Sequence, residues 1–313
     1  VTLENQNTSA TDTSVRLEIP AGWTVSPVEQ TTRLSRQGEK KSVSFTVTVP
    51  AGAPVGNFPI RAVARSGGRE FREGYTTIAY PHIDTRYVHA PAESTVEIFD
   101  VRTDVTSAGY VDGAGDRVAE ALEQLDVQVT HLNAMDLESG DLSRFPVIIL
   151  GVRAYAVRPD LVANNSRLLE YVEHGGTLVV QYNRSNEVPN IQLGPYPFTM
   201  TSNNNFRVTR EDAPVRILDS ANSLLNRPNK ITEEDFNGWV QERGTYFLSQ
   251  WDQRYTPLLA SNDPGEQPLL GGLVTAKYGK GTYIYTGYVF FRELPEGVKG
   301  AYRLFANLVS AGK

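Results

Sequence analysis

The chain has 313 residues, of which 40% are hydrophobic and 21% charged, and its net charge at pH 7 is −6. This balance is that of a folded globular protein, and the acidic excess disfavours nucleic acid and anionic membranes, which attract basic surfaces. Because the chain has no cysteine, disulfides, thiolate zinc sites, iron–sulfur clusters and cysteine nucleophiles are excluded. The longest apolar run, Val147–Val152, is far shorter than the roughly 20 residues that span a bilayer, so no membrane span is predicted.

The chain starts with Val-Thr-Leu, lacks an initial methionine and a signal peptide, and already has the character of a strand there. We therefore expect Val1 to be a processed or excised start with further sequence upstream. A missing export signal then carries no information about the compartment. The chain length favours two domains, at roughly 100–200 residues each.

Residues 1–82 alternate apolar and polar side chains in short runs, as in Val15–Ile19, Ser42–Val49 and Phe58–Ala64. Such alternation places one face of each strand in a core and the other in water. Proline and glycine turns separate the runs, at residues 20–23, 50–52 and 67–68. Several short strands at this spacing predict an N-terminal β-sandwich of Ig-like type.

Two segments of this region, LEIPAGWTVSP and GEKKSVSFTVTVPAGAPVGNFPI, resemble the NPCBM-associated domain first described in α-galactosidases. The resemblance covers most of residues 1–80 and includes a Pro-Ala-Gly-Trp turn and an alternating strand that ends in Val-Pro-Ala. Fibronectin-type and other bacterial sandwiches share parts of this pattern. Domains of the family accompany carbohydrate-active enzymes, so the resemblance implies a role beside such an enzyme.

The stretch around Pro81 and Pro91 shows little periodicity, which predicts a short, stiff linker at residues 83–94. Over residues 95–313, strands alternate with helices, as expected for a parallel sheet with helices on both faces. The predicted strands are Thr95–Val101, Val127–Leu132, Pro146–Val152 and Leu178–Tyr182, and the predicted helices are Asp116–Asp126 and Leu161–His174.

The segment 184–245 is rich in Asn, Pro and Arg and contains only short strand-like pieces such as Val215–Leu218. Regular structure resumes with Gly271–Lys277 and Gly281–Tyr288, which we predict to form a hairpin. The glycines of the connecting turn do not have the spacing of a phosphate-binding loop. Val298–Val309 closes the chain as a predicted helix.

Three segments after the predicted linker, GDRVAEALEQLDVQVTHL, LLEYVEHGGTLVV and AKYGKGTYIYTGY, resemble the class I glutamine-amidotransferase-like fold in its ThuA-like variants. The resemblance implies a flavodoxin-like α/β domain of three layers. The two domains in this order also resemble the region that follows the catalytic domain in some bacterial PIG-L (LmbE-like) deacetylases. This second resemblance implies an extracytoplasmic protein, periplasmic or secreted, with a catalytic zinc domain upstream.

The sequence departs from both families at the catalytic positions. Active amidotransferases carry a cysteine after a central strand, but here the comparable strand ends in Gln181-Tyr182-Asn183. The clustered His and Asp motif of the deacetylases is absent, and the four histidines are scattered, at positions 82, 89, 131 and 174. We therefore predict no catalytic residue, no metal site and no cofactor for this chain, which is the pattern of a pseudoenzyme.

A glycine-containing loop with two acidic residues, Asp112 and Asp116, opens the first predicted helix. Such a loop can hold an anion against the helix N-terminus or present a carboxylate to a sugar hydroxyl. The alternative is an ordinary helix start, in which acidic residues suit the helix dipole and glycines form the turn. A dinucleotide fingerprint fails because Val118 occupies the position of its third glycine.

Polar and aromatic residues follow two strands of the predicted sheet. Loops at the carboxyl ends of such strands converge on the ligand crevice, and guanidinium, amide and aromatic groups together suit a polyol or a carboxylated sugar. Salt bridges and interdomain packing would explain the same residues, and none is an evident nucleophile with a base beside it. The candidates are Arg153, Tyr155 and Arg158 after the first strand, and Gln181, Tyr182 and Asn183 after the second.

A denser aromatic and basic group comes later, at Trp239, Arg243, Tyr246, Trp251 and Arg254. Aromatic faces can stack on sugar rings or cover a neighbouring protein surface. Burial in the protein core is the alternative. We include Trp239, Arg243 and Trp251 among the candidate ligand-binding residues.

Three functions are compatible with these patterns. The first is a non-catalytic accessory region of an exported glycan-active enzyme of PIG-L type, which binds carbohydrate or docks against the upstream catalytic domain. The second is a hydrolase of sugar derivatives that uses a carboxylate, Asp112 or Asp116, with Arg153 and Tyr182. The third is a structural module for oligomerisation, although the sequence indicates no particular oligomeric state.

Overall fold

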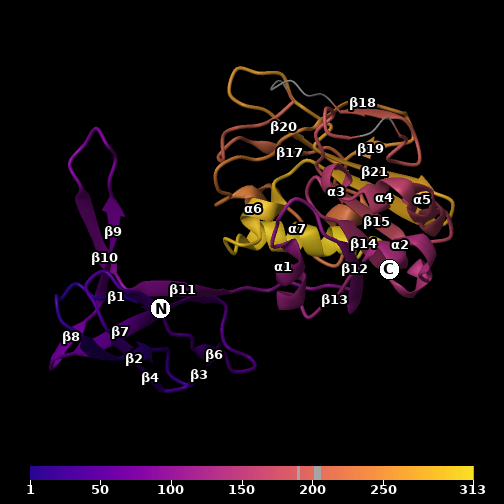
Figure 1. Ribbon diagram of the computed structural model, residues 1–313. Helices are drawn as coiled ribbons and strands as arrows, with labels where there is room; N and C mark the ends of the chain where they lie inside the picture. Colours follow the sequence, from indigo (N-terminus) through magenta and orange to yellow (C-terminus); the bar gives the residue numbers. More distant parts are fainter. Residues whose placement is uncertain (189–190, 201–205, 313) are drawn as a thin grey trace. The chain divides into compact units, whose positions relative to one another are not determined.

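The computed structural model describes residues 1–188, 191–200 and 206–312. The chain divides into two compact units, Val1–Asp100 and Val101–Lys313. The first unit consists of strands and their connections, whereas the second combines strands with helices (Figure 1). The protein is therefore multidomain, with a β-rich domain followed by a mixed α/β domain, as predicted.

The main sheet of the N-terminal unit is antiparallel and five-stranded within residues 1–100, all of which the structure describes. Its order is β11 (Glu93–Ile98), β7 (Gly56–Ser66), β2 (Thr11–Glu18) and β4 (Glu29–Leu34), with β8 (Arg69–Phe71) also paired to β7. Two shorter antiparallel pairs accompany it: β1 (Thr2–Glu4) with β5 (Lys40–Ser42), and β3 (Thr24–Ser26) with β6 (Thr46–Thr48).

The core of this unit is small, because alternation along its strands buries only every second side chain. Trp23 follows the Pro-Ala-Gly turn singled out in the sequence, and its backbone N–H donates to the Pro20 carbonyl at 3.2 Å. Its ring lies 5.4 Å from the ring of Phe58. The turn therefore carries a large aromatic side chain into the core. The buried apolar residues of the unit are Val15, Trp23, Leu34, Val43 and Val63.

The predicted linker at residues 83–94 is wrong, because these residues contribute to strands of the N-terminal unit. β9 (Glu73–Ile78) and β10 (Arg86–Pro91) form an antiparallel hairpin, and β11 then pairs with β7 along its whole length. The segment from Thr95, predicted as the first strand of the α/β sheet, is instead the last strand of the β-rich unit. Pro91 is interpreted from the sequence as part of a linker, but it is the last residue of a strand at a sheet edge, where the missing N–H is tolerated.

The described residues of the C-terminal unit form a seven-stranded mixed sheet. Neighbouring strands from β13 to β22 are parallel, β21 is antiparallel to β22, and β19 is antiparallel to β21. Every residue of β14 is buried, which explains its continuous apolar sequence. The order is β13 (Gln128–His131), β12 (Ser107–Val111), β14 (Val147–Leu150), β15 (Thr177–Gln181), β22 (Gly281–Thr286), β21 (Leu273–Tyr278) and β19 (Thr256–Pro257).

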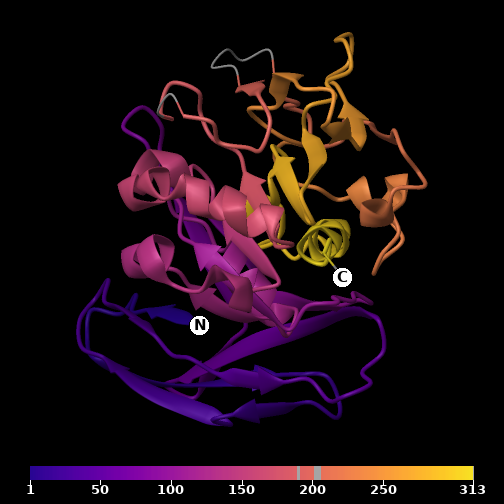
Figure 2. The same ribbon diagram turned by 90° about the vertical axis from the view of Figure 1, so that its right-hand side faces the viewer.

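Helices cover both faces of this sheet, and Figure 2 shows the helices of residues 134–173 on one side and the C-terminal helix on the other. On the first side, Leu168 and Val172 belong to the same core as Leu178 and Val180 of β15. On this side lie α2 (Ala134–Ser139), α3 (Ala154–Val157), α4 (Pro159–Ala163) and α5 (Asn165–Glu173). The other side carries α1 (Val118–Gln124) and α7 (Lys299–Val309), which are joined by a hydrogen bond from the Tyr302 hydroxyl to Gln124.

Most predicted elements of this unit are present, with different ends. The predicted hairpin is β21 and β22, and the closing helix is α7. The predicted helix at 161–174 is divided at Asn164 into α4 and α5. The poorly predicted segment contains two short antiparallel pairs, β16 (Phe198–Met200) with β18 (Leu248–Trp251) and β17 (Val215–Ile217) with β20 (Leu259–Ser261). Short helical turns are α6 (Phe290–Glu293), η1 (Leu142–Arg144), η2 (Ser223–Leu225) and η3 (Glu233–Phe236).

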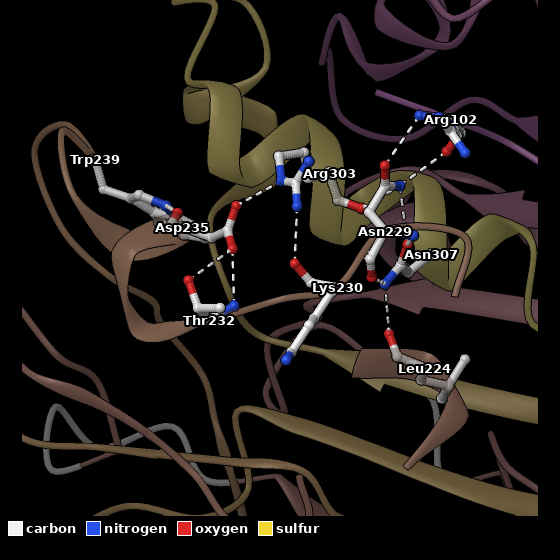
Figure 3. A network of polar contacts seen from close by, with 9 residues as sticks. All are labelled: Arg102, Leu224, Asn229, Lys230, Thr232, Asp235, Trp239, Arg303 and Asn307. Carbon is white, nitrogen blue, oxygen red and sulfur yellow. Dashed lines mark hydrogen bonds and ion pairs between the residues drawn. The ribbon is translucent and has the colours of Figure 1, made fainter. Parts of the chain in front are cut away.

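A polar network joins the first residues of this unit to the long connection and to α7 (Figure 3). The Asn229 side chain donates to the Arg102 carbonyl at 2.8 Å and accepts from the Arg102 N–H at 3.0 Å. The Asn307 side chain, on α7, donates to the carbonyls of Asn229 at 2.7 Å and Leu224 at 2.9 Å. Both amides are buried, and paired amides in a low-dielectric interior specify one arrangement of the segments that they join.

Candidate functional site

The loops after β12, β14 and β15 lie side by side at the carboxyl edge of the sheet. The backbone N–H of Ala114 donates to the Val152 carbonyl at 2.8 Å, and that of Arg153 donates to the Tyr182 carbonyl at 2.9 Å. The first contact requires glycine at position 113, since a Cβ atom there would lie 2.2 Å from the Val152 carbonyl oxygen. These loops therefore converge, as parallel neighbouring strands require.

Asp116 connects two of these loops. Its Oδ2 accepts from the Val152 N–H at 3.0 Å, and its Oδ1 accepts from the Val118 N–H at 3.1 Å and from the Tyr110 hydroxyl. Burial, and then the charge of Asp116, raise the pKa of Tyr110, so its hydroxyl stays protonated and donates. These contacts fit the alternative interpretation of Asp116, in which it starts a helix.

Asp112 faces solvent beside His131. The two side chains are 55% and 54% exposed, and Asp112 Oδ1 lies 2.9 Å from His131 Nδ1. Arg158 pairs with Asp160 at 2.6 Å and donates to the Leu132 carbonyl at 3.0 Å, so it anchors the start of α4. The pKa of Arg158 is raised mainly by its hydrogen bond to Asp160, with a smaller contribution from the charge of Asp112.

Arg153 follows β14 with a φ of 55°, a left-handed conformation that costs a non-glycine residue about 1–3 kcal/mol. Its guanidinium makes two contacts with the Glu187 carboxylate, Nε to Oε2 at 2.7 Å and Nη2 to Oε1 at 2.8 Å. Arg184 donates to the same carboxylate, Nη1 to Oε1 at 3.2 Å. The Arg153 hydrogen bond, with the charges of both arginines, lowers the pKa of Glu187 and keeps it ionised.

Aromatic rings lie beside these charges. The Tyr182 ring stacks on Tyr246 with centroids 5.4 Å apart and 12° between the planes, and it lies 5.4 Å from the Phe291 ring. The Arg184 guanidinium is 5.5 Å from the centre of the Tyr246 ring, within the range of a cation–π contact. We call this group the carboxyl-end cluster; it consists of Arg153, Tyr182, Arg184, Glu187, Tyr246 and Phe291.

The sequence reveals this cluster only in part. It associates Arg153 with Tyr182, and the position of Arg184 and Glu187 just after β15 is a signal that could have added them. Tyr246 is assigned from the sequence to a different group, and Phe291 has no signal at all. Both reach the cluster from segments far along the chain, and no periodicity links them to β15.

Three other candidates after β14 and β15 are buried. The Tyr155 hydroxyl donates to Asn165 Oδ1 at 2.6 Å within the core. The Gln181 amide donates to the Leu150 carbonyl at 3.3 Å, and the Asn183 amide donates to the Gln181 carbonyl at 3.0 Å. These side chains are buried and form hydrogen bonds within the unit, which fits the alternative interpretation as packing residues.

The late aromatic and basic group separates into different places. Trp239 and Arg243 are buried; Trp239 Nε1 donates to the Asp235 carbonyl at 3.0 Å, and Arg243 Nε donates to the Ala213 carbonyl at 2.9 Å. These two are core residues, as in the alternative interpretation. Trp251 is partly buried opposite Phe198 in the β16–β18 pair. Arg254 lies 3.7 Å from the centre of the Tyr196 ring and pairs with Asp252 at 2.7 Å.

Glu293 is a buried carboxyl that the sequence does not reveal. It is 0% exposed, and its Oε2 accepts from the Val240 N–H at 2.9 Å. Burial raises its pKa to about 8, against the opposing effects of that hydrogen bond and of Arg243. The residue is therefore largely protonated at neutral pH.

Two further properties concern the described residues alone. Within residues 1–188, 191–200 and 206–312, no group of three or more His, Cys, Asp or Glu side chains is arranged to hold a metal ion. In the same described ranges, no helix is both long enough and apolar enough to cross a membrane.

Comparison with family models matches residues 1–67 to one family, the NPCBM-associated, NEW3 domain of alpha-galactosidase. The resemblance seen in the sequence is thereby confirmed for this segment. The match lies entirely within the N-terminal unit. No curated protein matches the chain.

Solved structures similar to the chain have low identity. A cytoplasmic protein of Salmonella typhimurium is 13% identical over 76% of this chain and 94% of its own, with a TM-score of 0.41. A cold-adapted β-galactosidase of Rahnella is 17% identical over 66% of this chain, with a TM-score of 0.38, and a β-galactosidase of Halorubrum lacusprofundi is 17% identical over 66%, with 0.39. The chain spans 31% and 30% of these two enzymes. These scores are too low to establish a shared fold.

Proposed function

We propose that this chain is a non-catalytic accessory region of a glycan-active enzyme and that it binds carbohydrate at the carboxyl-end cluster. The observation that carries this function is the juxtaposition of stacked aromatic rings with two guanidinium groups at the carboxyl edge of the sheet. Aromatic faces pack against the apolar faces of sugar rings, while fixed polar groups bind hydroxyls and acids. The NEW3 match, to a domain named for an alpha-galactosidase, supports a place beside a glycan-active enzyme.

In this proposal the N-terminal unit, an Ig-like β-sandwich, is a spacer, and the C-terminal unit is a three-layer, amidotransferase-like domain without the catalytic cysteine. The enzyme upstream is an exported deacetylase of PIG-L type. Support for these finer assignments comes from the sequence resemblances and from the parallel strands with helices on both faces. The proposal predicts that the gene also encodes, upstream of this chain, a catalytic domain with a zinc-binding His and Asp motif.

A glycan array tests the binding function. The wild-type chain is expected to bind a set of glycans, and Tyr246→Ala should weaken that binding about tenfold, the equivalent of about 1.4 kcal/mol of ring contact. Tyr246→Phe is the matched control, since it keeps the ring and should keep the binding. Circular dichroism of each variant establishes that the fold is intact.

Absence of glycan binding by the wild-type chain, together with absence of binding to the upstream domain, would contradict the accessory role. Equal binding by Tyr246→Ala and the wild-type chain would place the glycan elsewhere than at the carboxyl-end cluster.

A carboxylate-dependent hydrolase is the second candidate, and the contact between Asp112 and His131 favours it. A carboxylate that orients an imidazole leaves the other ring nitrogen able to take a proton from water. Asp112→Asn should then abolish turnover of an ester, amide or glycoside, while Asp84→Asn, at an exposed position of the other unit, should not. Failure of the wild-type chain to turn over any substrate in a broad screen would exclude this candidate.

A further inference from the structure

The carboxyl-end cluster has more hydrogen-bond donors than its own carboxylate can satisfy. Arg153 and Arg184 share Glu187, so two positive charges face one negative charge. Arg184 uses Nη1 for this contact, and its side chain is 38% exposed. A guanidinium has five N–H donors in a planar fork that fits carboxylates. The arrangement therefore has the capacity to bind an additional or alternative anion.

The shape of the Arg153–Glu187 contact shows which anion fits. Its two short contacts are the fork-to-fork geometry of a guanidinium and a carboxylate. Glu187 is 23% exposed at its side chain and comes from the turn after β15, so solvent reaches this pair. Tyr246 and Phe291 are partly buried beside it and supply ring surface for the remainder of a sugar.

We infer that the cluster selects acidic glycans: Arg153 and Arg184 bind the carboxylate of a uronic acid residue, and Glu187 holds that position when no glycan is bound. This inference rests on the carbohydrate-binding function proposed above and adds the class of sugar to it. Glu187 then acts as an internal competitor. Its removal frees both guanidinium groups and increases the positive charge of the site, whereas loss of either arginine removes the preference for acid.

The test is titration calorimetry with uronate oligosaccharides and with the same oligosaccharides after their carboxyl groups have been reduced to alcohols. Each pair has the same linkages and differs only at the carboxyl position, where a neutral hydroxymethyl group replaces the carboxylate. The wild-type chain is expected to bind the acidic form about tenfold more tightly than the reduced form. Glu187→Gln should bind the acidic form more tightly still, by about tenfold, and so widen the difference in affinity between the two forms. Arg184→Gln should bind the two forms equally.

Matched controls exist in the same unit, since Arg254 also lies over a tyrosine ring and pairs with an aspartate. Arg254→Gln and Asp252→Asn should therefore have wild-type affinities. Sodium acetate at the same carboxylate concentration should compete poorly, which separates a sugar acid from a free carboxylate. Thermal unfolding of every variant identifies any that fails to fold. If Glu187→Gln fails to fold, Arg184→Gln still tests the inference, because the Arg184 side chain is 38% exposed.

The results separate the two levels of the proposal. Equal affinity of the wild-type chain for acidic and reduced forms, or weaker acid binding by Glu187→Gln, overturns the acidic-glycan inference and leaves carbohydrate binding intact. Binding of neither form overturns the inference as well. If, in addition, no neutral glycan of the array is bound, carbohydrate binding itself fails.

Discussion

The two units of this protein bury their side chains in different ways. In the N-terminal unit, strands such as β2 alternate between buried and partly buried positions, so the core is one shallow layer. In the C-terminal unit, every residue of β14, β15 and β22 is buried, because helices cover both faces of the sheet. A sheet covered twice has an interior deep enough to hold polar groups away from water.

This difference determines where an ionisable side chain can be held away from water. The C-terminal unit buries the Glu293 carboxyl completely, and this burial raises its pKa. In the N-terminal unit the charged residues pair at the surface, as Arg72 does with Glu18 at 2.8 Å. Solvent screens such pairs and keeps them weak.

The largest effect is expected from shortening a side chain in the deeper core. Leu178→Ala, at a position that is 0% exposed, should lower the free energy of unfolding of the C-terminal unit by about 2–5 kcal/mol, because a cavity remains. Val15→Ala should lower that of the N-terminal unit by about 1–2 kcal/mol. Differential scanning calorimetry should show each variant shifting only its own transition. Equal shifts of a single transition would mean that the two units unfold together.

A pH-dependent effect is expected from Glu293. Its pKa is about 8 when folded against 4.5 in the reference state, so the folded chain binds a proton that the unfolded chain lacks between these pH values. The free energy of unfolding should therefore fall as pH rises from about 4.5 to 8, by at most roughly 1.4 kcal/mol for each pH unit. Glu293→Gln should flatten this slope in denaturant unfolding. An unchanged slope would show that Glu293 is ionised in the folded protein.

A smaller loss is expected in the network of Figure 3. Asn307→Ala removes the donors to Leu224 and Asn229 and leaves buried carbonyls without partners, which costs about 1–3 kcal/mol. Asn237→Ala, at an exposed position, serves as the control and should be neutral. Hydrogen exchange should show faster exchange in the segment around Asn229 for the first variant alone. Equal protection in both variants would mean that the network contributes little.

The smallest effect is expected at the surface of the N-terminal unit. Arg72, followed by Arg16, lowers the pKa of Glu18 to about 2. The contribution of this pair is therefore present at neutral pH and lost as pH falls through about 2. Arg72→Gln should raise the pKa of Glu18 in an NMR titration while the unfolding midpoint stays the same within error, because both side chains are exposed. A clear drop in the midpoint would show that this surface pair stabilises more than its exposure allows.

Local patterns were enough to place most regular elements. The apolar run of β14, the β21–β22 hairpin and helix α7 each have a period or a turn that is visible within a few residues. The C-terminal boundary of the β-rich unit could not be predicted from such local patterns. β11 has the length of a strand from either unit, and only its pairing with β7 shows to which one it belongs.

The residues of the candidate site also fall into two groups, those predicted from local sequence and those placed only by the fold. Periodicity, the lack of cysteine and the residues just after β14 and β15 are properties of short stretches, so they pointed to Arg153 and Tyr182 before any fold was known. The positions of Tyr246 and Phe291 beside Tyr182, and the burial of Tyr155, Gln181 and Asn183, became evident only in the folded chain. The physical reason is that contacts between distant segments depend on strand order and helix packing, which short-range periodicity does not encode.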